Sequence, residues 1–275
     1  MARQILMFVP SKLLQIGPGS RGWITITEQG IKQSFDLTKV MFSRGNISEK
    51  IRFGKLVQPG ELVLDMYAGI GYYTLPALVI GQARYVYSCE WNPHAASFLR
   101  YNLEQNGVND RASVLEGDSR VRVTEENILD LDFDRVSLGL LPSSEGGWET
   151  AVKAIRKDIG GWLHIHANVP SHEHDKWALW MCSELSRMYK HIYSDDTVWV
   201  LCHRIEKVKS FAPKVDHIVA DVFIGPQLPD SMSNIFQNCK VGVFTKDGYF
   251  MESPSNAETP SSALGNGVLD QEWMI

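Results

Sequence analysis

The chain has 275 residues, of which 44% are hydrophobic and 21% are charged, and its formal net charge is −5. This is the composition of a globular protein, and no apolar run approaches the roughly 18 residues that span a membrane. Its four cysteines lack CxxC spacing and its first residues lack the layout of a signal peptide, which favours a cytoplasmic protein with reduced thiols.

Charge is distributed unevenly along the chain. Residues 1–57 contain nine Lys or Arg and three Asp or Glu, whereas residues 252–275 contain four acids and no base. A localised basic region is the electrostatic footprint that a phosphate backbone requires, although a merely solvated basic surface fits the charge equally well. The negative net charge therefore does not exclude a nucleic-acid partner.

The chain begins with a predicted β-rich lead-in. Residues 23–27 alternate apolar and polar side chains, Gly30 makes a turn, and residues 33–36 pair back. A helix is expected to follow from Asn46, because Glu49 stands three residues on, at the spacing of a capping box.

Three segments are predicted on this basis. Residues 1–58 form the lead-in and its helix, and residues 59–225 form an α/β core. Residues 226–275 form a carboxyl-terminal extension with a hairpin near residues 246–248. We expect it to be largely disordered after about residue 252, where Ser, Asn, Pro and Gly predominate.

The stretch LVLDMYAGIGYYT, residues 62–74, gives the strongest functional signal. It predicts a buried strand, a turn at Gly69 and Gly71, and the start of a helix, which together bring bare backbone close to a nucleoside. Asp65 at the strand end would repel a pyrophosphate and attract a cation, and Thr74 stands where a dinucleotide site has its third glycine. We therefore favour S-adenosylmethionine, a cation without phosphates, over a dinucleotide or an ordinary structural turn.

The next two predicted strands both lead into acids. Residues 84–89 form a strand ending at Glu90, which lies 21 residues after Gly69. A carboxylate that binds ribose hydroxyls is expected roughly 20 residues after such a turn. Residues 112–116 form a third strand, and Asp118 beyond it can accept a hydrogen bond from the adenine amine. A solvated acid and a turn aspartate are the plain alternatives for these two residues.

The rest of the core is predicted to alternate strands with helices. Lys209 and Phe211 lie in an expected loop at 206–215, which emerges at the carboxyl edge where ligands bind. A basic residue beside an aromatic suits phosphate contact and base stacking, and an ordinary polar loop is the alternative. The strands are expected at 134–140, 162–169, 197–205 and 216–223, and the helices at 92–106, 148–159 and 173–192.

Six motifs occur in one order: FSRGNISEK (42–50), DMYAGIGYYTLP (65–76), CEWNPHA (89–95), LEGDSR (115–120), LGLLPSSEGGW (138–148) and GGWLHIHANV (160–169). Together they resemble the tRNA wybutosine-synthesizing protein 2 family, which is related to tRNA (guanine-N1)-methyltransferases. The resemblance implies an α/β, Rossmann-like class I methyltransferase fold. Its mostly parallel seven-stranded sheet has an antiparallel last strand.

The resemblance also implies an activity other than methyl transfer. The family moves the 3-amino-3-carboxypropyl group of S-adenosylmethionine onto 4-demethylwyosine, a tricyclic guanosine-derived base beside the anticodon of phenylalanine tRNA. 5′-Methylthioadenosine leaves. A tRNA guanine-N1 methyltransferase and a non-catalytic tRNA-binding module are the alternatives. We expect a monomer without membrane attachment, whose first 58 residues are a shortened tRNA-binding region.

Several residues match positions that contact the cofactor in this family. Ser43 and Lys50 match those at the methionine end, where a lysine supplies positive charge for the carboxylate. Glu90 is implied at the ribose, and Asp118 with Ser119 at the adenine, although asparagine is the expected residue at position 119. The candidate RNA contacts are Arg44, Arg52, Lys209 and Phe211.

The acceptor side is less defined. Enzymes that methylate exocyclic amines often have Asn-Pro-Pro-Tyr after the fourth strand, whereas residues 140–145 read LLPSSE and contain no Asn. Glu145 is a weak candidate for a proton acceptor, and we favour a helix-start acid instead. His164 and His166 share a strand face and are expected to line a cleft or the surface. No metal is expected, because no Cys or acid cluster completes a coordination sphere.

Overall fold

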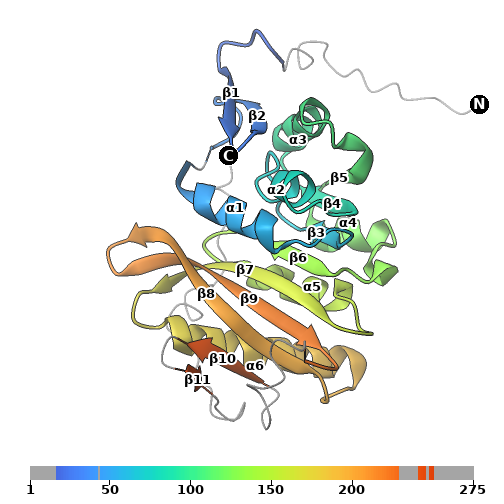
Figure 1. The fold of residues 1–275 in the computed structure, drawn as a ribbon, viewed down its shortest axis with the longest axis vertical. Coiled ribbons are helices and arrows are strands. Elements are labelled where there is room, and N and C mark those ends of the chain that lie inside the picture. Colours follow the sequence, from blue (N-terminus) through green and yellow to red (C-terminus); the bar gives the residue numbers. More distant parts are fainter. Residues whose placement is uncertain (1–16, 43, 229–240, 246–247, 251–275) are drawn as a thin grey trace, which may run out of the picture.

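A computed structural model describes residues 17–42, 44–228, 241–245 and 248–250 (Figure 1). The lead-in forms a separate antiparallel sheet of β1 (Trp23–Glu28) and β2 (Ile31–Asp36), as the sequence predicts. Gln29 and Gly30 between them have φ angles of 51° and 82°. Positive φ at both turn residues matches the twist of a tight hairpin.

The core is one large sheet with the strand order β11-β10-β8-β9-β7-β6-β3-β4-β5. The predicted seven-stranded core is confirmed: six strands run parallel, and β9, the last of them in sequence, runs antiparallel between β7 and β8. The bounds are β3 (Leu62–Asp65), β4 (Tyr85–Glu90), β5 (Ala112–Glu116), β6 (Arg135–Leu138), β7 (Gly161–Pro170), β8 (Trp199–Ala212) and β9 (Val215–Gly225).

Beyond β8 the sheet continues with β10 (Val241–Thr245) and β11 (Gly248–Phe250). Their antiparallel pairing places Thr245 opposite Gly248, which confirms the predicted hairpin. The predicted disordered tail lies outside the described residues. Within the described part of the chain, every helix is too short or too polar to cross a membrane.

Helices cover both faces of the sheet (Figure 1). The side chains of β3 alternate between these two faces. Val63 packs on one face with α1 (Ile47–Leu56), α2 (Thr74–Val79) and α3 (Pro93–Gln105). Leu62 and Leu64 pack on the other face with α4 (Ser119–Glu125), α5 (Trp148–Ala154) and α6 (His174–Tyr193). Because β3 is buried on both sides, it reads as a continuous apolar run.

Three local predictions are wrong. The expected loop at 206–215 is mostly strand, because β8 continues to Ala212 and turns only at Pro213 and Lys214. The helix expected at 148–159 ends at Ala154, because Ile155 pairs with Phe133 as a buried β-bridge. α1 begins where expected, but the side chain of its N-cap residue, Asn46, makes no capping hydrogen bond.

Candidate cofactor and acceptor site

The site lies at the point where the strand order reverses. β3 pairs with β4 on one side and with β6 on the other, and ligands of open α/β sheets bind in the crevice at such a point. The chain leaves β3 through Gly69 and Gly71, which have φ angles of 56° and 105°. A Cβ atom at Gly69 would lie 2.8 Å from the Tyr72 ring, and one at Gly71 would lie 2.9 Å from the Leu75 side chain. The turn therefore requires glycine at both predicted positions.

Asp65 ends β3 and is completely buried. Its Oδ2 accepts a 2.8 Å hydrogen bond from the Thr74 hydroxyl, which lies 2.9 Å from the Ser88 hydroxyl. Its Oδ1 has no hydrogen-bond partner. Burial raises the pKa of Asp65 to about 6. Thr74, where a dinucleotide site has glycine, therefore holds one carboxylate oxygen, and the other is buried without a partner.

Glu90 fixes the glycine turn to the neighbouring strand. One carboxylate oxygen accepts a 2.7 Å hydrogen bond from the Gly69 amide, and the other accepts a 2.8 Å bond from the Asn92 amide. Burial raises the pKa of Glu90, and these backbone donors oppose the rise. The carboxylate thus lies beside the glycine turn with a defined orientation, as a ribose contact requires.

Asp118 and Ser119 lie at the start of α4, next to Glu90. The Gly117 amide donates a 2.9 Å hydrogen bond to the Glu90 carbonyl, which brings the loop after β5 to the end of β4. Asp118 caps α4 and is ion-paired with Arg120, which holds the pKa of Asp118 below its usual range. Ser119 is buried and hydrogen-bonds the Tyr67 hydroxyl. In this arrangement Asp118 makes the contacts of a turn aspartate.

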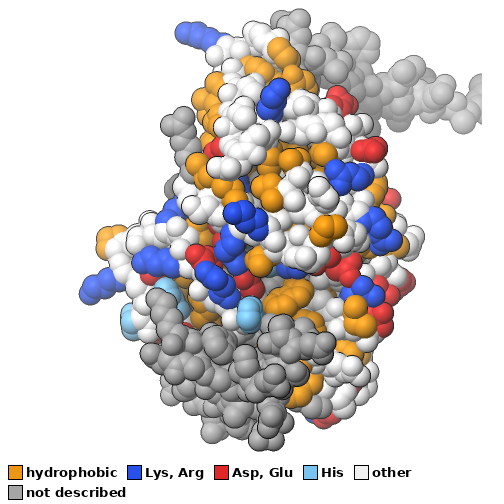
Figure 2. Space-filling view, viewed as in Figure 1, with side chains coloured by type: hydrophobic (Ala, Val, Ile, Leu, Met, Phe, Trp, Pro, Cys, Tyr) orange, Lys and Arg blue, Asp and Glu red, His pale blue; other side chains and the backbone are white. Residues whose placement is uncertain are grey.

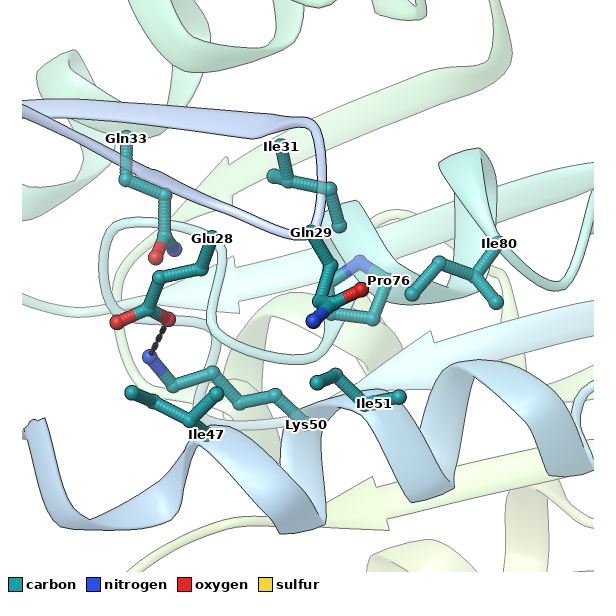
Figure 3. A pocket seen from close by; sticks show the side chains of 9 residues that line it. All are labelled: Glu28, Gln29, Ile31, Gln33, Ile47, Lys50, Ile51, Pro76 and Ile80. Carbon is teal, nitrogen blue, oxygen red and sulfur yellow. Dashed lines mark hydrogen bonds and ion pairs between the residues drawn. The ribbon is translucent and has the colours of Figure 1, made fainter.

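Lys50 extends from α1 toward the lead-in (Figure 3). Its Nζ lies 2.9 Å from Oε2 of Glu28, and 4.8 Å and 5.1 Å from the ring centroids of Phe42 and Tyr72. The lysine thus stands near the glycine turn, but its charge is paired with a protein carboxylate. The cavity beside it, about 10 Å³, has room for one water. It is lined by Glu28, Gln29, Ile31, Gln33, Ile47, Lys50, Ile51, Pro76 and Ile80.

Arg52, a predicted RNA contact, is paired within the protein. Its side chain is 16% exposed and binds both oxygens of Glu49 at 2.7 Å and 2.8 Å. It also pairs with Asp221 of β9, whose Oδ1 lies 2.6 Å from Nδ1 of His164. Arg52 and Asp221 are 169 residues apart in the sequence, so no local pattern could reveal their ion pair. Ser43 and the side chain of Arg44 lie outside the described residues.

His164 and His166 share one face of β7, as predicted, but both are buried instead of lining a cleft or the surface. The Nε2 atom of His164 lies 2.6 Å from the Arg135 guanidinium, and Nδ1 of His166 lies 2.9 Å from Nε2 of His217. Burial lowers the pKa of His166 well below 6.5 and that of His217 to about 4, so both are neutral at pH 7. In the described part of the chain, no three His, Cys, Asp or Glu side chains group as metal ligands.

The loop after β6 packs against β7. The backbone amide of Asn168 donates a 2.9 Å hydrogen bond to the Pro142 carbonyl, and Ser143 forms a β-bridge with Ala167. The Ser143 hydroxyl donates a 2.9 Å bond to Glu145, which lies before α5 as the helix-start interpretation expects. The acid therefore lies at the same edge of the sheet as the cofactor candidates.

The β8–β9 hairpin projects from this edge (Figure 1). Phe211 is 58% exposed, and Lys209 lies against the 3₁₀ turn η2 (Arg44–Asn46), where a Cβ atom on Gly45 would be 2.9 Å from its Nζ. Figure 2 shows Lys and Arg side chains gathered over α1 and along this hairpin. The structure thus places a basic, aromatic-tipped arm beside the candidate cofactor site, as the parallel direction of β8 predicts.

Known proteins are similar to this chain in sequence and fold. A family model described as the TRM5/TYW2 methyltransferase domain matches residues 25–180. tRNA wybutosine-synthesizing protein 2/3/4 of Arabidopsis thaliana is 46% identical over 210 residues, which are 76% of this chain and 20% of that protein. The chain therefore spans about a fifth of the length of this curated relative.

Two solved structures are similar. TYW2 of M. jannaschii in complex with AdoMet gives a TM-score of 0.62 at 26% identity and covers 75% of this chain and 87% of its own. TYW2 of P. horikoshii in complex with MeSAdo gives a TM-score of 0.61 at 30% identity and covers 76% of this chain and 74% of its own. The chain belongs to the TRM5/TYW2 methyltransferase-domain family.

Proposed function

We propose that this chain is the catalytic part of an S-adenosylmethionine-dependent tRNA 3-amino-3-carboxypropyltransferase. The acceptor would be 4-demethylwyosine beside the anticodon of phenylalanine tRNA, and 5′-methylthioadenosine would leave. The 2.7 Å hydrogen bond between Gly69 and Glu90 carries the proposal, because it sets the carboxylate that would bind the ribose against a glycine turn at the switch point of the sheet. The wybutosine-synthesizing relative and the TYW2 structures with AdoMet and MeSAdo support it.

Different residues of the chain would bind different parts of the cofactor. Glu90 would bind the ribose hydroxyls, Asp118 and Ser119 the adenine, and Asp65 would favour the positive charge of the ligand. Lys50 and Ser43 would bind the methionine carboxylate, for which Lys50 must exchange its pairing with Glu28. Three carbons flank the sulfonium, so the choice of transferred group is mainly a matter of positioning.

The decisive experiment is to incubate the chain with labelled S-adenosylmethionine and hypomodified tRNA and to weigh the nucleosides. Addition of the aminocarboxypropyl group is the expected result. Addition of a methyl group alone would favour the guanine-N1 methyltransferase. Calorimetry without detectable S-adenosylmethionine binding would favour a non-catalytic tRNA-binding module.

Cofactor affinity should depend on pH through Asp65. Below the folded pKa of about 6 we expect affinity to fall about tenfold per pH unit, because protonation neutralises the acid that would favour a cationic ligand. Since this pKa is raised above the ordinary 3.8, Asp65 stabilises the fold at low pH and loses that contribution as pH rises through 6. Weak binding at pH 5 would therefore not reflect unfolding through Asp65.

Calorimetry between pH 5 and 7 on the wild type and on Asp65→Asn measures this effect. The variant keeps an acceptor for Thr74 but has no charge to titrate, so its weaker affinity should be flat across the range. An equally steep profile in the variant would assign the titration to another group.

The hairpin should contribute to tRNA binding in two separable ways. Phe211→Ala should weaken binding by at least about 1 kcal/mol through lost stacking, with an unchanged salt dependence. Lys209→Gln should flatten the slope of log affinity against log salt by about 0.7–0.9, the value for one phosphate contact. Lys153→Gln, on α5, is the control, because Lys153 is 40% exposed and pairs with Glu149. An equal loss in the control would contradict a specific role for the hairpin.

A further inference from the structure

The side-chain amide of Asn168 is buried without a hydrogen-bond partner. Neither its Oδ1 nor its Nδ2 has a partner, and both atoms are shielded from solvent. A buried polar group left in this state costs about 1–3 kcal/mol, and native proteins contain few of them. Asn168 therefore requires an explanation other than fold stability.

The position of Asn168 is informative. It lies near the carboxyl end of β7, on the face that carries His164 and His166, and its register partner on β9 is His217. Its backbone amide is bonded to the Pro142 carbonyl of the loop after β6. On β7, Asn168 thus lies between that loop and the root of the β8–β9 hairpin.

The loop after β6 has no side-chain amide to offer an acceptor base, because residues 140–145 read LLPSSE. Its Ser143 hydroxyl is bonded to Glu145, and its Ser144 hydroxyl lies 3.3 Å from the indole nitrogen of Trp148. A primary amide presents one donor and one acceptor side by side, which pairs with a base edge that offers the complementary pair. RNA bases splayed out of a loop are commonly recognised through such edges.

We propose that Asn168 reads the edge of the acceptor base, so that β7 supplies the amide that the loop after β6 lacks. The inference rests on the proposed function, since it assigns a residue to the acceptor side of the same site. His217 offers a third unpartnered atom, Nδ1, on the adjacent strand. Because these atoms are shielded, the incoming base must displace part of the loop at 141–145.

Asn168→Leu tests the proposal, because leucine fills a similar volume without polar atoms. We expect an unchanged or higher melting temperature, an unchanged affinity for S-adenosylmethionine, and at least a tenfold lower kcat/KM for transfer to hypomodified tRNA. Asn102→Leu is the matched control for burial, since Asn102 is completely buried but accepts a 2.7 Å hydrogen bond from the Ser34 amide and donates a 2.9 Å bond to the Ile70 carbonyl. The control should lower the melting temperature.

Two results would overturn the proposal: full transfer activity in Asn168→Leu, or a loss of melting temperature as large as that of Asn102→Leu. A binding measurement keeps the test independent of transfer. Wild type should prefer hypomodified tRNA over the same tRNA with adenosine at the acceptor position, and Asn168→Leu should reduce that preference at least fivefold. A wild type that transfers nothing but discriminates in this way would refute the proposed function and leave the base-reading role of Asn168 standing.

Discussion

Asp221→Ala should lower the free energy of unfolding by about 3–5 kcal/mol, because it removes one partner from a buried ion network. The Asp221 carboxylate is 4% exposed and contacts both Arg52 of α1 and His164 of β7. Burial would raise the pKa of Asp221, but His164 and Arg52 outweigh it and hold the pKa well below its ordinary value. Its loss would leave the Arg52 guanidinium largely buried with only Glu49 to balance it.

Urea denaturation at pH 7 measures the effect, with Glu149→Ala as the control. Glu149 pairs with Lys153 one helical turn away and is 59% exposed, so its removal should cost only about 0.3–0.5 kcal/mol. A cost for Asp221→Ala no larger than that of the control would mean that the network contributes nothing to stability. Because the folded pKa is lowered, the contribution of Asp221 is present above the ordinary pKa of 3.8 and is lost as pH falls below it.

The network also links stability to the site. Arg52 and Glu49 belong to α1, the helix that carries Lys50, and Asp221 belongs to the sheet. Breaking the network should therefore loosen the helix that carries Lys50, the proposed ligand of the methionine carboxylate. We therefore expect Asp221→Ala to lower the affinity for S-adenosylmethionine, although Asp221 is not assigned to any cofactor contact.

Sequence patterns predict the features that depend on neighbours in the chain. The glycine turn is one example, because the positive φ angles of Gly69 and Gly71 and the buried strand before them are encoded within a dozen residues. The position of Glu90 is another example, because only one helix, α2, separates the glycine turn from the end of β4, which fixes their spacing in the chain. The mostly parallel seven-stranded sheet with an antiparallel last strand was implied by the family resemblance, whereas the strand order is known only from the structure.

Features that depend on distant partners could not be predicted in this way. From the sequence, Arg52 is expected to be a surface base, and only the structure shows that it pairs with Asp221. Lys50 is likewise expected to be an unpaired cation, and only the structure shows its ion pair with Glu28. The sequence at 206–215 resembles a loop for two reasons. β-Bulges interrupt the alternation of side chains along the strands, and residues exposed to solvent beyond the sheet need not be apolar. Asn168 gives no local signal, because only the structure reveals that its amide is buried and unpartnered.

Glu90→Ala should weaken S-adenosylmethionine binding by about 10- to 150-fold, since charge-assisted hydrogen bonds to a ribose contribute roughly 1.5–3 kcal/mol. Glu116→Ala is a matched control, because Glu116 is the register partner of Glu90 at the end of β5, is 45% exposed and pairs only weakly with Arg100 at 3.3 Å. The control should bind normally, and both variants should remain folded.

A second ligand separates the two ends of the cofactor. 5′-Methylthioadenosine has the ribose and adenine but no methionine carboxylate, so Glu90→Ala should weaken its binding as much as that of S-adenosylmethionine. Lys50→Met should weaken binding of S-adenosylmethionine alone, because the lysine is assigned to the carboxylate. If Glu90→Ala left both affinities unchanged, the 2.7 Å bond to Gly69 would serve only to hold the turn. If Lys50→Met weakened both ligands equally, its pairing with Glu28 would be structural, and the positioning of the transferred group would need another residue.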